Sequence, residues 1–156
     1  MRIVVYGEPG AQGSKRFLRT TATGKGIMVE QNAKVEPWRQ DVKKAAEAVL
    51  DQLGRPEPFQ GAVACRMVFT FLRPPSVKRN KRPWPSVAPD LSKLCRSTED
   101  ALTSAGVWRD DCLVTEYTRL AKVYANEDPD ALDRAGVLIV ILPLVAELEL
   151  EGRGIK

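Results

Sequence analysis

The chain has 156 residues, of which 44% are hydrophobic and 28% are charged, and these values suit a single globular domain. It contains no histidine, which excludes Ser-His-Asp catalysis, Cys-His catalysis and histidine-containing zinc sites. The three cysteines are far apart, so they indicate neither a disulfide framework nor a CxxC metal site. No apolar run reaches the roughly 18 residues of a membrane span, and we expect a cytoplasmic protein.

In the first half of the chain the pattern predicts a strand, a helix and a second strand. The first strand covers residues 1–7, and residues 10–16 are expected to form a turn with two cations. Thr23-Gly24-Lys25-Gly26 is a candidate hairpin turn in an otherwise ambiguous segment. A helix with one apolar face opens at Pro37 and stops at Gly54. The second strand, about residues 62–72, alternates apolar residues with period two.

Residues 73–89 carry five prolines and five basic residues without an acid, which predicts a long, extended and exposed loop. We expect its cations Lys78, Arg79, Lys81 and Arg82 to contact a polyanion, although an ordinary solvated loop has the same composition. Trp84 in this loop has two open interpretations, stacking on an unpaired base or anchoring in the protein's own core.

A second helix is predicted from about Asp90 to Ala105, with Asp90 as its N-cap and Gly106 as its C-terminal stop. Strands at about residues 113–124 and 136–145 follow, and residues 146–156 read as a polar tail. The order of elements predicts a single α+β domain over residues 1–156, with two main helices packed on a mixed or antiparallel sheet.

The second helix places one carboxylate at its start, Asp90, and a pair just past its end, Asp110-Asp111. Carboxylates and water are the ligands that Mg²⁺ prefers, and a divalent metal can activate water for phosphodiester cleavage. Arg96 lies six residues beyond Asp90, about 9 Å along the helix, where it can reach a phosphate. The alternatives are a simple cap at Asp90, a surface pair between Arg96 and Asp100, and a polar turn at Asp110-Asp111.

The region 89–111 also resembles the core signature of RusA-like Holliday junction resolvases. The matching residues are Pro89-Asp90-Leu91, Lys93-Leu94, Arg96, Asp100-Ala101-Leu102-Thr103, Gly106-Val107-Trp108 and Asp110-Asp111. Gly13-Ser14-Lys15-Arg16 and Pro37-Trp38 are similar to phage-borne members of that family. The resemblance implies an α+β homodimer that nicks four-way DNA junctions symmetrically in the presence of Mg²⁺.

The same resemblance implies roles for individual residues. Asp90 and Asp111 match the metal-binding aspartates, Asp110 is an acidic neighbour, and Arg96 matches a basic position of the site. Ser92 stands where the family commonly has a second aspartate, and a neutral hydroxyl is a weaker magnesium ligand. The cations expected to contact DNA are Lys15, Arg16, Lys78, Arg79, Lys81, Arg82, Lys93 and Lys122.

Two functions therefore remain open at this point. The first is an active, magnesium-dependent junction-resolving endodeoxyribonuclease. The second is a branched-DNA-binding protein that keeps the fold and the charge but has an impaired metal site because of Ser92. A phage structural protein with a chance motif is the least favoured interpretation.

Overall fold

The computed structural model describes residues 1–13, 15–30 and 32–145, with the backbone alone at 15–18 and 27–30. The predicted polar tail, 146–156, lies outside the described residues. The elements in chain order are β1 (Arg2–Tyr6), β2 (Lys15–Thr20), β3 (Gly26–Glu30), α1 (Val35–Gln52), β4 (Val63–Phe71), α2 (Leu91–Ala105), a 3₁₀ turn η1 (Asp111–Leu113), β5 (Val114–Tyr124) and β6 (Gly136–Pro143).

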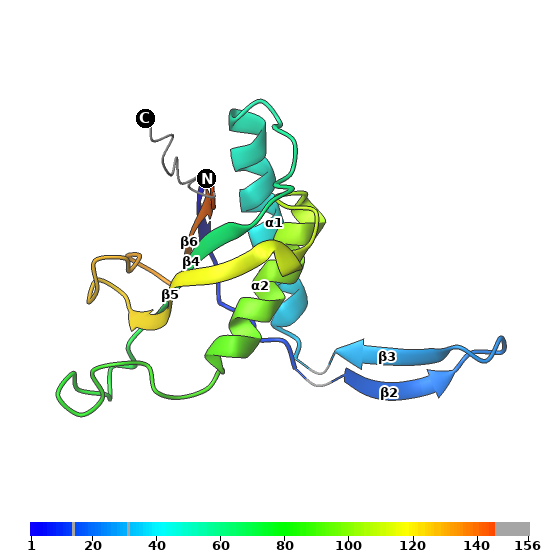
Figure 1. Ribbon diagram of the computed structural model, residues 1–156. Helices are drawn as coiled ribbons and strands as arrows, with labels where there is room; N and C mark the ends of the chain where they lie inside the picture. The colour runs from blue at the N-terminus through cyan, green and yellow to red at the C-terminus, as the bar shows by residue number, and fades with distance from the viewer. Residues whose placement is uncertain (14, 31, 146–156) are drawn as a thin grey trace, which may run out of the picture.

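Four strands form a mixed sheet in the order β1-β6-β4-β5 (Figure 1). The central strand β4 runs antiparallel to β6 and parallel to β5, so that Phe69 lies opposite Val137 on one side and Lys122 on the other. The parallel pairing requires a crossover, which the chain makes through a long loop and α2. This arrangement confirms the predicted α+β class with its mixed sheet and two main helices.

The core forms where α1 and α2 pack on one face of the sheet. Alternate residues of β4 point to this face, and Cys65, Met67 and Phe69 are completely buried there. Trp38 of α1 is also buried, and its indole N–H donates to the Thr98 hydroxyl of α2 over 3.0 Å. Trp38 and Phe69 therefore both belong to the core.

The two helices lie where the sequence predicted them, and only the start of α1 is a few residues earlier. Helix α1 begins at Val35, so that Pro37 lies inside its first turn, where proline is tolerated. Helix α2 has Asp90 at the N-cap position and ends at Ala105, and the φ of its C-cap residue Gly106, 79°, is left-handed. Glycine has no Cβ to clash in that conformation, and the predicted C-terminal stop is confirmed.

An antiparallel hairpin, β2–β3, projects away from the body of the molecule (Figure 1). Its turn lies at residues 21–25, where the Thr21 N–H donates to the Lys25 carbonyl, which confirms the expected hairpin turn. The expected turn over residues 10–16 is wrong at its end, because Lys15 and Arg16 already belong to β2. Their backbone pairs with Glu30 and Val29 of β3, and cross-strand pairing is information that the local sequence does not contain.

Candidate functional site

Asp90 presents an exposed carboxylate at the N-terminal end of α2. Its side chain is 62% exposed and accepts no hydrogen bond from the first turn of α2, all of which the structure describes. The expected side-chain cap is therefore not formed, although the residue occupies the N-cap position. Its carboxylate instead pairs with the ammonium of Lys93, one turn along the helix, at 3.2 Å. An exposed pair of this kind is weak, so the oxygen atoms remain accessible to a cation from solvent.

Lys122 of β5 holds the chain just before Asp90. Its ammonium donates to the carbonyl oxygens of Val87 at 2.6 Å and Pro89 at 2.8 Å. Burial lowers the pKa of Lys122, and the nearby charge of Asp90 opposes that shift. The expected contact of Lys122 with DNA stays a prediction, whereas its contact with the backbone beside Asp90 is present in the structure.

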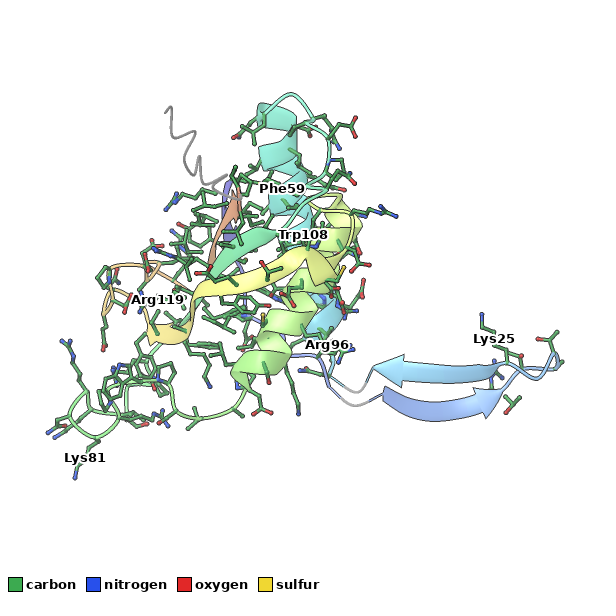
Figure 2. The ribbon with its side chains drawn as sticks, in the orientation of Figure 1. Lys25, Phe59, Lys81, Arg96, Trp108 and Arg119 are labelled. Carbon is green, nitrogen blue, oxygen red and sulfur yellow. The ribbon has the colours of Figure 1, made fainter. Side chains whose placement is uncertain are left out.

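Arg96 is exposed on α2 and forms no ion pair with any of the described residues. The pair considered with Asp100 is absent, because Asp100 pairs with Arg39 of α1 at 2.5 Å. Arg96 lines an open hollow of about 340 Å³ together with Gln12, Gly13 and Lys93. Figure 2 shows it on α2 beside the base of the β2–β3 hairpin. Its guanidinium is therefore available to a phosphate.

Asp110 and Asp111 follow α2 at the start of η1. Asp110 accepts a hydrogen bond from the backbone N–H of Cys112 at 2.8 Å. Hydrogen bonds from Cys112 hold the pKa of Asp110 below its usual value. Asp111 is exposed, and Cys112 beside it is an exposed free thiol. Both carboxylates are thus accessible, but Asp110 also has a structural function as the cap of η1.

Glu99 is a neighbour of Asp111 that sequence reasoning missed. The helical wheel places Glu99 on the solvent side of α2, but the hydroxyl of Tyr117 from β5 covers it and donates to its carboxylate. Burial raises the pKa of Glu99, the hydrogen bond from Tyr117 opposes this rise, and the charge of Asp111 adds to it. No signal in the sequence pairs Tyr117 with Glu99, because the contact joins a helix to a distant strand.

Asp90 is the N-cap residue of α2, whereas Asp110 and Asp111 follow the helix and begin η1. Asp111 lies close enough to Glu99 for its charge to raise the pKa of Glu99. Within residues 1–13, 15–30 and 32–145, no group of three acidic or cysteine side chains is arranged to hold a metal. One chain therefore does not gather Asp90, Asp110 and Asp111 into a three-carboxylate cluster. Ser92 is exposed in the first turn of α2, and its role as a ligand stays a prediction.

The basic loop, residues 73–89, is folded and not extended as its prolines suggested. Successive turns are closed by hydrogen bonds from Val77 N–H to the Pro74 carbonyl and from Lys81 N–H to the Lys78 carbonyl. A nonlocal contact holds the loop in place, because Arg73 forms a bidentate ion pair with Glu127 from the β5–β6 connection. The expected extended conformation is wrong because proline fixes φ but does not prevent turns.

Only some cations of the basic loop are free of protein partners. Arg79 lies 3.6 Å from Glu127, and the Arg82 guanidinium donates to the Tyr124 hydroxyl at 2.9 Å. Lys78 and Lys81 are exposed and form no ion pair within the described part of the chain. Figure 2 shows Lys81 at the outer end of the loop. The side chains of Lys15 and Arg16, also expected at DNA, lie outside the described residues.

No helix among the described residues is long and apolar enough to cross a membrane. No curated protein matches the chain. The family model Endodeoxyribonuclease RusA matches residues 7–132, which include the basic loop, α2 and the Asp110-Asp111 pair. This match covers most of the chain, and it agrees with the exposed carboxylates and free cations around α2. The chain is therefore a member of the RusA family of endodeoxyribonucleases, which resolve Holliday junctions.

Proposed function

We propose that this chain nicks four-way DNA junctions in a Mg²⁺-dependent reaction, with Asp90 and Asp111 as the metal-binding carboxylates. The observation that carries the proposal is the exposed carboxylate of Asp90, which makes no cap hydrogen bond to α2. On the same helix, the guanidinium of Arg96 forms no ion pair within the described residues. These residues fit a hard cation, because Mg²⁺ binds one or two carboxylates together with water and phosphate oxygens. A complete cage of protein ligands is not required for such a site.

In this proposal each residue around α2 has a separate task. Bound Mg²⁺ supplies a water of lowered pKa and offsets negative charge on the phosphate. Arg96 binds a phosphate oxygen and stabilises charge that develops during attack. Lys93 pairs with the Asp90 carboxylate in the absence of metal. Lys122 holds the backbone just before Asp90 through its hydrogen bond to the Pro89 carbonyl. Lys78 and Lys81 contribute affinity for the DNA backbone.

The proposal is tested by replacing Asp90 and Asp111 separately with asparagine. The amide keeps the shape of the side chain but is neutral, so we expect nicking of a synthetic four-way junction to disappear while junction binding persists. Asp51→Asn is the matched control, because Asp51 is an exposed aspartate at the C-terminal end of α1, paired with Arg55. Nicking by wild-type protein should require Mg²⁺ and stop in chelator. Equal loss of binding and cleavage in both variants would show that the aspartates are structural.

A second candidate function is favoured by Ser92. Because the residue at this position is neutral and exposed, the metal site has one carboxylate fewer than the family pattern implies. The chain would then bind branched DNA without cutting it. The same assay separates the two functions, since this candidate predicts junction binding without nicking at any Mg²⁺ concentration.

We also propose that the active protein is a homodimer. Resolution of a four-way junction needs two symmetric cuts, and a two-fold dimer supplies two equivalent sites. Light scattering at micromolar concentration tests this directly. A monomer under conditions in which the protein nicks both strands of a junction symmetrically would overturn it.

A further inference from the structure

Trp84 is the most exposed aromatic side chain of the described residues. The chain has three tryptophans, all in the described part. Trp38 and Trp108 are 0% and 1% exposed, whereas Trp84 is 70% exposed. An exposed indole keeps a large apolar surface in water, and such residues are enriched where proteins contact partners. The sequence left Trp84 open between a stacking residue and a core anchor, and its exposure rules out the core anchor.

The backbone around Trp84 is held firmly on both sides. Before it, Arg82 donates to Tyr124, and the carbonyls of Arg82 and Pro83 accept hydrogen bonds from Arg73. After it, Pro85 is buried, and the Ser86 N–H donates to the Trp84 carbonyl at 2.8 Å. The indole is therefore presented to solvent by a fixed segment.

The loop that carries Trp84 combines apolar surface with positive charge. Leu72 is 63% exposed and Val87 is 48% exposed, and both border a hollow of about 170 Å³ under the basic loop. Lys78 and Lys81 lie in the same loop, and neither is neutralised by an acid among the described residues. A flat apolar side chain in the same loop as exposed ammonium groups fits a ligand with stackable faces and a polyanionic backbone.

The loop also connects Trp84 to the candidate site. Trp84 precedes Asp90 by six residues, and Lys122 holds the intervening backbone through the carbonyls of Val87 and Pro89. A group bound at Trp84 is thus placed at a fixed position relative to the exposed carboxylate of Asp90. This connection makes Trp84 suitable for fixing which part of a DNA substrate reaches the carboxylate.

We propose that Trp84 stacks on a base that is unstacked at the branch point, and so distinguishes junctions from continuous duplex. This inference rests on the proposed function, because it requires binding of branched DNA. Every base has a π face, so the contact selects DNA shape and tolerates different sequences. In a continuous duplex both faces of each base are covered by neighbouring bases, so the indole of Trp84 cannot stack on them.

The test uses the intrinsic fluorescence of the full chain, with chelator present to prevent cleavage. Acrylamide reaches exposed indoles, so collisional quenching in free protein reports mainly on Trp84. We expect a four-way junction to protect Trp84 from acrylamide, and duplex of equal length to protect it much less. Anisotropy of labelled DNA, measured in parallel, reports binding. Trp84→Ala should weaken junction binding by about 5- to 150-fold, as expected for one base stack, and should weaken duplex binding little.

Two further variants sharpen the test. Trp84→Phe should recover most of the junction affinity, because a phenyl ring still stacks. Leu53→Ala, which removes another exposed apolar side chain at the end of α1, should leave binding unchanged.

Each other outcome overturns the inference in a distinguishable way. Junction binding with undiminished quenching removes Trp84 from the interface and leaves the proposed function intact. Equal protection by junction and duplex replaces branch recognition with a general DNA contact. Protection that depends on protein concentration without DNA assigns the surface to a second copy of the chain. Absence of any junction binding refutes both the inference and the proposed function.

Discussion

The lysines of the basic loop offer a quantitative test of how this chain holds DNA. Four cations of the loop were expected to contact phosphates, but Arg79 and Arg82 already have partners in the protein. Lys78 and Lys81 remain free among the described residues. Each phosphate contact contributes about 0.9 to the slope of log affinity against log salt on duplex DNA. Replacing Lys78 and Lys81 with alanine should therefore lower that slope by about 1.8.

This change is large enough to measure directly. When salt rises from about 50 to 200 mM, the affinity of wild type for DNA falls steeply. The affinity of the double variant should fall by a factor about 12 times smaller, because its slope is lower by about 1.8. The assay is fluorescence anisotropy of a labelled four-way junction in chelator. An Arg79→Ala, Arg82→Ala variant is the control, and it should alter the slope less. An unchanged slope in the lysine variant would refute the reasoning and make the β2–β3 hairpin the leading candidate for DNA contact.

Three other changes test the site and the fold. Ser92→Asp should lower the Mg²⁺ concentration needed for half-maximal nicking, because it restores the family's second carboxylate; a higher requirement would show a site rebuilt around the hydroxyl. Thr98→Val should cost about 1–3 kcal/mol in urea unfolding, since it leaves the buried Trp38 indole N–H without an acceptor; a loss below about 0.5 kcal/mol would mean that the indole finds another acceptor. Arg119 lowers the pKa of Asp128 by hydrogen bonding, so this stabilisation is complete above the unfolded pKa of about 3.9 and is lost as pH falls through the folded pKa. The urea midpoint of Asp128→Asn should accordingly fall less than that of wild type between about pH 7 and pH 3, and equal falls would contradict the assigned cause.

The periodic elements of this fold were predictable from sequence because their signals are local. The apolar face of α1, the alternation in β4, and the Gly106 stop of α2 all depend on neighbours within a few residues. The hairpin β2–β3 was recognisable only at its turn. Its strands pair with each other and not with the main sheet, so the usual burial signal is weak.

The candidate site was predictable in its residues and not in its arrangement. The motif around α2 identified the exposed carboxylates, but the proximity of Asp111 to Glu99 depends on how the chain leads from α2 into β5. The partner of Glu99 is Tyr117, and the partner of Arg73 is Glu127; both contacts cross from one element to another. The conformation of the basic loop is fixed by the second of these contacts, which its own composition does not reveal.

The parallel pairing of β4 and β5 has a consequence for how this protein can change over time. The basic loop is part of a connection whose ends are fixed by the sheet and by α2. The entropy lost on closing a flexible loop grows only with the logarithm of its length, so doubling the length costs about 0.6 kcal/mol. Insertions or deletions that leave the contacts of Arg73 and Arg82 in place therefore cost little folding stability through loop closure. The DNA-contacting residues of the loop can therefore change in evolution while the register of β4 and β5 and the position of Asp90 are kept.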